Sequence, residues 1–167
     1  ANIRYLHHLG EVTYFSPLAD TSLPDAGFVY LPGGYPELYL AALSANRPML
    51  QSIRRYVENG GKLLAECGGM MYLCDEIRDK NGDVFPMVGV LHQSATMENM
   101  KLRLGYRTLL YNDARLKGHE FHYSRLVEQQ DPLPSCAVAY TAKGVKTDTP
   151  LYHYKNVWAG YTHLYWA

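Results

Sequence analysis

The sequence predicts an α/β core followed by an antiparallel β extension, because its two halves differ in pattern. In the first half, the apolar run at 28–31 is typical of a strand buried on both faces, and 62–66 predicts the next strand. They alternate with segments of helical period at 36–59 and 70–77. Such alternation with short joins implies parallel strands linked by right-handed crossovers. The second half is mainly strand-like, which predicts antiparallel pairing.

The N-terminal residues predict a helix, a strand and a loop before the first buried strand. Residues 3–9 fit the end of a helix that Gly10 closes. Residues 11–15 predict a short strand. Residues 17–27 contain two prolines and several small polar residues, which indicate a loop.

The following segments continue the alternation. Within 36–59, Pro48 suits the first turn of a second helix, and Asn59-Gly60-Gly61 ends it. A strand at 62–66, a sharp turn and a helix at 70–77 follow. The second half then predicts strands, with turns between them, at 102–111, 119–128, 137–142 and 157–166.

Composition excludes several classes of function. The 167 residues suit one domain, and 16 basic against 16 acidic side chains give zero net charge. A neutral chain carries no electrostatic footprint for nucleic acid or an anionic membrane, and no apolar run is long enough to span a bilayer. Three cysteines without a C-x-x-C spacing predict neither a disulfide framework nor a metal site, and they favour the cytoplasm.

Cys67 is the strongest candidate for chemistry. It lies where the predicted strand 62–66 turns into a helix, and two glycines follow it, as in a nucleophile elbow. This geometry puts the sulfur at the carboxyl edge of the sheet. The start of the next helix is expected to lower the pKa of the thiol, and the Gly68 N–H to face an oxyanion. The alternative is a buried structural cysteine. Paired glycines at 33–34 form a second turn of this kind and could supply another N–H.

A cysteine nucleophile needs a base, and two histidines are the main candidates. His119 and His122 point to opposite faces of a strand, so they cannot readily bind one metal. Glu120 and His122 share a face and could form a carboxylate–imidazole pair. His163 follows a glycine in an aromatic-rich strand. The residues by themselves leave His122 and His163 both open.

Four sequence blocks resemble a known family. They are Leu-Pro-Gly-Gly-Tyr-Pro-Glu at 31–37, Ala-Glu-Cys-Gly-Gly-Met-Met-Tyr-Leu at 65–73, Gly-His-Glu-Phe-His-Tyr-Ser at 118–124 and Gly-Tyr-Thr-His-Leu-Tyr-Trp at 160–166. Together they resemble the C-terminal glutamine amidotransferase domain of the cobyrinic acid a,c-diamide synthases. The blocks follow the family's order and span nearly the whole chain.

The resemblance implies a class I, triad-type glutaminase on a flavodoxin-like, mostly parallel sheet flanked by helices. It implies that Cys67 attacks the side-chain amide of L-glutamine and that His163 is the general acid/base. Gly34 and Gly68 would donate backbone N–H groups to the oxyanion. No cofactor or metal is expected in this domain.

The resemblance also implies partners outside this chain. In the family, an N-terminal synthetase domain uses ATP and Mg²⁺ to activate two acetate groups of the corrinoid substrate. No phosphate loop of the Gly-x-x-x-x-Gly-Lys-Ser/Thr type occurs here. Residues 1–167 are therefore expected to be one domain excised from a longer synthase, lacking even its first strand. Neither nucleic acid nor membrane is expected as a partner.

Two positions depart from the glutaminase pattern. Tyr165 replaces the glutamate expected two residues after His163, so Glu120, with His122, is the candidate orienting residue. Met71 replaces the glutamine expected four residues after Cys67, so glutamine recognition must differ. A non-catalytic domain that retains the fold is therefore an alternative. The amidotransferase domains of the related cobyric acid synthases and nickel-tetrapyrrole diamide synthases are further alternatives. The sequence does not identify which tetrapyrrole is amidated or the oligomeric state.

Overall fold

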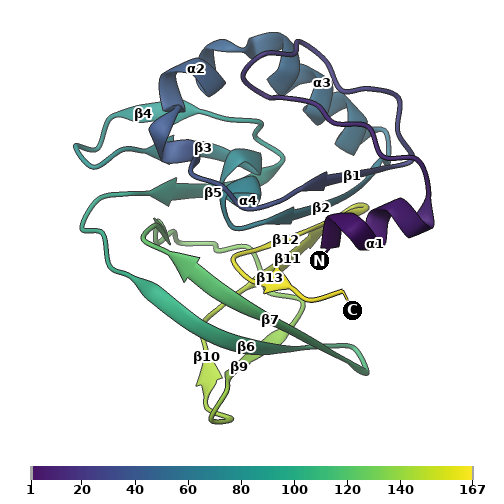
Figure 1. The fold of residues 1–167 in the computed structure, drawn as a ribbon. Helices are drawn as coiled ribbons and strands as arrows, with labels where there is room; N and C mark the ends of the chain where they lie inside the picture. The colour runs from purple at the N-terminus through teal and green to yellow at the C-terminus, as the bar shows by residue number, and fades with distance from the viewer. Residues whose placement is uncertain (1, 167) are drawn as a thin grey trace.

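The computed structural model describes residues 2–166, which form three sheets and a small set of helices (Figure 1). The central sheet has the order β1-β2-β12-β11. Its strands are β1 (Phe28–Leu31), β2 (Lys62–Glu66), β12 (Val157–Gly160) and β11 (Leu151–Tyr154). β1, β2 and β12 run parallel, and β11 is antiparallel to β12.

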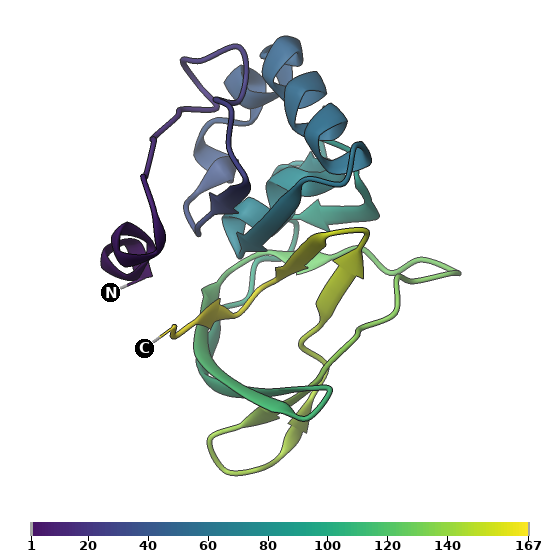
Figure 2. The ribbon, with the colours of Figure 1, turned by 90° about the vertical axis from the view of Figure 1, so that its right-hand side faces the viewer.

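Helices cover one side of this sheet. They are η1 (Pro36–Leu38), α2 (Leu40–Ala45), α3 (Arg47–Glu58) and α4 (Gly68–Leu73). In α3 the fully buried side chains of Met49, Ile53 and Val57 recur at helical spacing and join the core cluster that contains Leu63 of β2. α1 (Asn2–Leu9) lies apart from this layer, and its Asn2 side chain donates to the Leu164 carbonyl at 2.7 Å (Figure 2).

A second sheet continues from α4, with the order β4-β3-β5-β8. Its strands are β3 (Cys74–Arg78), β4 (Val84–Pro86), β5 (Leu91–Thr96) and β8 (Arg125–Leu126). β3 and β5 pair in parallel, whereas β4 and β8 pair antiparallel at the two edges.

The third sheet is wholly antiparallel, with the order β10-β9-β6-β7-β13. A long hairpin of β6 (Arg103–Tyr111) and β7 (Ala114–His122) dominates it (Figure 1). The other strands are β9 (Val138–Thr141), β10 (Lys146–Thr147) and β13 (His163–Leu164). Only Tyr161 and Thr162 separate β12 of the central sheet from β13 of this one.

The α/β class and the antiparallel extension are confirmed, but several predicted elements are wrong. The strand predicted over 119–128 is instead β7, Ala114–His122, because residues 114–118 pair with β6 and leave no break before His119. Residues 11–15 form no strand, because no strand in 2–166 offers them a hydrogen-bonding partner; Phe15 still packs against the core. The helix predicted over 70–77 ends at Leu73, because the next residues pair with β5 and β4 as strand β3. No helix within 2–166 is long and apolar enough to cross a membrane.

Candidate active site at the strand-to-helix turn

Cys67 occupies a strained turn between β2 and α4. Its φ of 51° and ψ of −110° lie in a region that non-glycine residues rarely adopt. The backbone N–H donates to the Gly160 carbonyl of β12 at 2.8 Å, which anchors the turn to the central sheet. A β-carbon on the next residue, Gly68, would crowd the carbonyl of Gly34. The two glycine turns of the sequence therefore pack directly on each other.

The thiol of Cys67 is buried, and this overturns one expectation. Burial raises its pKa to about 11, and the negative charges of Glu37, Glu120 and Glu66 add to the increase. The hydrogen bond from the Gly68 N–H lowers the pKa by less than burial raises it. The predicted lowering is therefore wrong, because α4 is only six residues long and desolvation dominates. A protonated thiol needs a base to become a nucleophile.

A small cavity of about 20 Å³ lies beside the thiol, where the Sγ of Cys67 donates to the Phe121 carbonyl at 3.8 Å. Its volume is about that of one water molecule. The lining residues come from the 34–37 turn, the Cys67 elbow, Met97 and the end of β7; they are Gly34, Tyr35, Glu37, Cys67, Met71, Met97, Phe121, His122, Tyr123 and Ser124.

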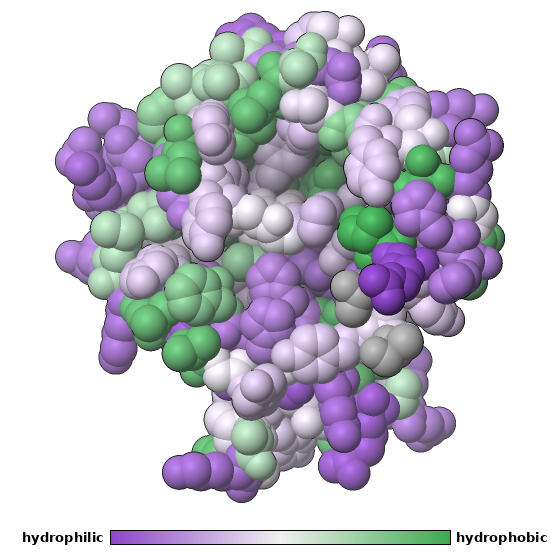
Figure 3. Space-filling view, in the orientation of Figure 1, coloured by the Kyte–Doolittle hydropathy of each residue, from purple (hydrophilic) through white to green (hydrophobic). Residues whose placement is uncertain are grey.

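A larger pocket of about 330 Å³ opens beside the same glycine turns, and Figure 3 shows a hollow in the upper half of this face. Its walls include Phe15, Tyr30 and Tyr72 but neither Cys67 nor His163. We assign the site to the small cavity because the candidate nucleophile Cys67 lines it and does not line the larger pocket.

His163 of β13 is held from three sides. A β-carbon at Gly33 would overlap its imidazole, and the ring of His119 stacks on it with centroids 4.9 Å apart. Its Nδ1 lies 3.8 Å from Oε2 of Glu66. Burial lowers the pKa of His163, and His119 and His122 lower it further. No hydrogen bond joins Cys67 to His163 within the described residues. Both nevertheless lie beside the 33–34 turn, because Gly68, the residue after Cys67, packs on Gly34, and the His163 ring packs on Gly33.

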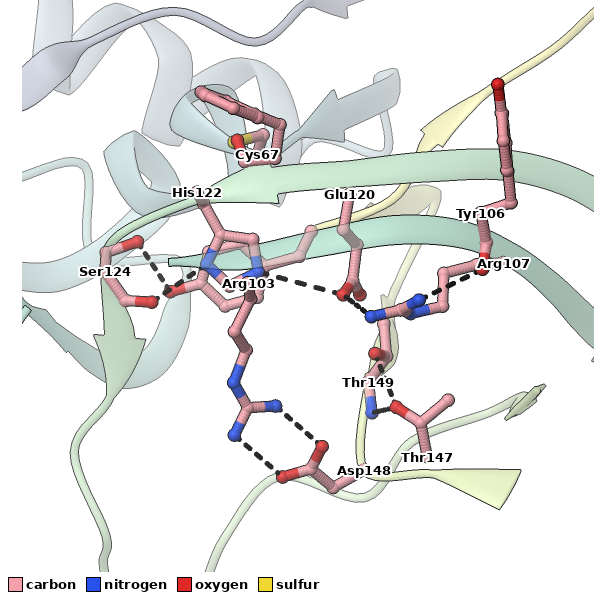
Figure 4. A network of polar contacts seen from close by, with 12 residues as sticks. Cys67, Arg103, Tyr106, Arg107, Glu120, His122, Ser124, Thr147, Asp148 and Thr149 are labelled. Atoms are coloured by element: carbon pink, nitrogen blue, oxygen red, sulfur yellow. Dashed lines mark hydrogen bonds and ion pairs between the residues drawn. The ribbon is translucent and has the colours of Figure 1, made fainter. Parts of the chain in front are cut away.

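Glu120 and His122 form a different, buried cluster (Figure 4). The predicted same-face pairing is confirmed, since Oε2 of Glu120 lies 3.9 Å from Nε2 of His122 and 2.8 Å from Nη2 of Arg107. The Nδ1 of His122 lies 2.8 Å from the Ser124 carbonyl, and its ring stacks on Tyr161 at 3.7 Å. Burial lowers the pKa of His122. Glu120 therefore faces Arg107 and His122 and makes no ion pair with His163.

The carboxylate beside His163 is Glu66, which the sequence reasoning missed. It is buried at the end of β2, directly before Cys67, and a charged residue closing an apolar strand was the available signal. Tyr165, at the expected glutamate position, instead places its hydroxyl 3.0 Å from Nδ1 of His119. It reaches His163 only through the stacked His119 ring.

Met71 forms part of the cavity wall. Its sulfur accepts a hydrogen bond from the Ser124 hydroxyl at 3.2 Å, and that hydroxyl lies 3.0 Å from the Tyr161 hydroxyl. A thioether thus occupies the place of the expected amide and is already engaged by the protein. Within residues 2–166, no group of three histidine, cysteine, aspartate or glutamate side chains is arranged to hold a metal ion.

Comparison with known proteins assigns the chain to a family. The model of the CobB/CobQ-like glutamine amidotransferase domain matches residues 1–167. The hydrogenobyrinate a,c-diamide synthase of Pseudomonas aeruginosa is 39% identical over 99% of the chain and 38% of its own length. The cobyrinate a,c-diamide synthase of Fusobacterium nucleatum is 40% identical over 98% of the chain and 38% of its own length.

A solved glutamine amidotransferase has a similar fold, with a TM-score of 0.54 and 17% identity over 82% of this chain and 70% of that one. The chain spans about two fifths of the length of the two curated relatives. Because the family model covers every residue, the chain belongs to the CobB/CobQ-like glutamine amidotransferase domain family.

Proposed function

We propose that the chain hydrolyses L-glutamine to glutamate and ammonia through a thioester on Cys67. The observation that carries the proposal is the strained Cys67 elbow, whose sulfur borders a cavity, together with the neutral imidazole of His163 on β13. A strained strand-to-helix turn is the usual way to present a nucleophile at a sheet edge.

In the first half-reaction, His163 takes the thiol proton and the sulfur attacks the side-chain amide carbon. The backbone N–H groups of Gly34 and Gly68 donate to the developing oxyanion. The imidazolium then gives its proton to the leaving nitrogen, the C–N bond breaks and ammonia leaves. A thiol with a pKa of about 11 requires this base at neutral pH.

In the second half-reaction, water attacks the thioester carbon while His163 accepts its proton. The C–S bond breaks, glutamate leaves and the thiol regains its proton. Glutamine would lie in the small cavity, which must widen to admit it, with Met71 and residues 121–124 along its wall. Met71 replaces the expected amide contact by an apolar one.

The ammonia would serve a synthetase domain outside this chain. The two curated relatives are named for a,c-diamide formation and are much longer than the chain. We therefore infer that residues 1–167 are the glutaminase domain of a synthase that amidates the a and c acetate groups of cobyrinate or hydrogenobyrinate, using ATP and Mg²⁺ in its other domain. Three free cysteines favour a reducing, cytoplasmic setting.

Glutamate release from L-glutamine tests the proposal, measured on the chain and on the longer polypeptide that contains it. Cys67→Ser should abolish turnover, whereas Cys136→Ser, at a half-buried position away from the cavity, should retain it. A diazoketone analogue of glutamine should add covalently to Cys67. Turnover that survives Cys67→Ser would contradict the mechanism, and an inert wild-type protein that the analogue does not label would favour the non-catalytic alternative.

A further inference from the structure

We propose that Glu66 is the positioning residue of His163, holding the imidazole with Nδ1–H toward its carboxylate so that Nε2 is free to take the Cys67 proton. The inference rests on the proposed glutaminase function and deepens it. The Oε2 of Glu66 lies 3.8 Å from Nδ1 of His163, which is an ion-pair distance. Contacts of this kind tighten when the imidazole becomes charged during the reaction.

The Glu66 carboxylate is itself fixed by two donors. The Tyr30 hydroxyl donates to Oε2 at 2.7 Å, and the Leu164 N–H donates to Oε1 at 3.1 Å. Leu164 follows His163 in β13, so the carboxylate is bonded to the same strand that carries the imidazole. The side chain is buried, so water does not compete for these hydrogen bonds.

These donors also favour the charged form of Glu66. Burial raises the pKa of Glu66 above its ordinary value, and the Tyr30 and Leu164 hydrogen bonds offset part of that rise. Both oxygens accept hydrogen bonds, as an ionised carboxylate does. The groups that face His163 are Glu66 from β2 and His119 and His122 from β7, and Glu66 is the only acid among them.

The other candidates for this role are engaged elsewhere. Glu120 pairs with Arg107 at 2.8 Å, and Tyr165 contacts His119. An orienting carboxylate fixes the histidine tautomer and stabilises the imidazolium. Glu66, directly before the nucleophile, can fix the tautomer of His163 and stabilise its imidazolium. It would thus take the role of the glutamate that is expected at position 165, where this chain has tyrosine.

Three variants test the inference in the protein that shows Cys67-dependent glutaminase activity. Glu66→Gln keeps the shape and removes the charge; we expect kcat to fall at least about tenfold, with KM nearly unchanged. The acidic limb of the kcat/KM profile should move to lower pH, because an imidazolium without its carboxylate loses its proton more readily. Glu66→Asp should keep the acidic limb near its original pH. The matched control is Glu58→Gln, which changes an exposed carboxylate on α3. It should change neither kcat nor the acidic limb of the profile.

Nitrogen NMR of His163 provides a readout independent of turnover. We expect the Nδ1–H tautomer in the wild-type protein and its loss in Glu66→Gln. A wild-type Nε2–H tautomer, or a Glu66→Gln profile with an unmoved acidic limb, would overturn the inference. So would Glu120→Gln reproducing both changes. If glutamate formation does not depend on Cys67, the proposed function fails while the tautomer measurement still decides the role of Glu66.

Discussion

Gly33 faces His163 so closely that a β-carbon on the glycine would overlap the imidazole carbon Cε1. Gly33→Ala should displace the ring, and misplacing a catalytic group by about 1 Å can cost on the order of 100-fold in rate. The kcat for glutamate release measures this loss. The matched control is Gly27→Ala, because a β-carbon there would meet no atom within 4 Å. Full activity in Gly33→Ala would show that His163 can act from another position.

The three thiols should differ in reactivity in an order set by burial. Cys67 is buried with a pKa of about 11, so roughly one thiol in a thousand is ionised at pH 8. Burial raises the pKa of the fully buried Cys74 too, whereas Cys136 is only half-buried. Iodoacetamide followed by peptide mass spectrometry should therefore label Cys136 first. Cys136→Ser should remove the fast adduct, and preferential labelling of Cys67 would contradict the burial argument.

The buried Arg107–Glu120 pair should matter to stability far more than the exposed Arg103–Asp148 pair. Glu120→Ala leaves a guanidinium that is only 11% exposed without its partner, which costs about 3–5 kcal/mol. Asp148→Ala removes a surface partner, with an expected cost below about 1 kcal/mol. Urea unfolding measures both free energies. Equal, small losses would mean that water reaches Arg107 in solution.

Stability should decline as the solution becomes mildly acidic. Burial lowers the pKa of His122 in the folded state, so the unfolded chain takes up a proton at a higher pH than the folded chain. The free energy of unfolding therefore falls as pH drops below the ordinary histidine value of about 6.5. Burial of His163 acts in the same direction. The free energy of unfolding, measured with urea between pH 7.5 and 5.5, should depend less steeply on pH in His122→Gln than in the wild-type protein. The same pH dependence in both proteins would contradict the assignment.

Local patterns predicted the elements around Cys67 well, because the chain there carries its own signals. The short segment 62–66 predicted β2 with its observed bounds, and the glycines after Cys67 predicted the elbow. The strand predicted at 11–15 failed because a strand also needs a neighbour to pair with. The change from helix to strand at Cys74 depends on β5, which lies well downstream in the sequence.

The site could be predicted only where a single segment determines it. Glu120 and His122 share a face of β7, so their pairing followed from strand alternation. The Glu66–His163 contact joins residues nearly a hundred positions apart, on strands of different sheets, and no periodicity reports such a contact. The high pKa of the Cys67 thiol likewise depends on how deeply the neighbouring segments cover it.

The two residues between β12 and β13 connect the central sheet to the antiparallel sheet, and the thiol and the imidazole are attached to different sheets. The thiol belongs to the central sheet through the bond of Cys67 to Gly160, and the imidazole belongs to the antiparallel sheet through the pairing of β13 with β7. The two sheets are joined at this point, because the Leu164 N–H of β13 donates to the carboxylate of Glu66, the last residue of β2. A substitution that breaks this contact would change the separation of nucleophile and base even though it touches neither of them.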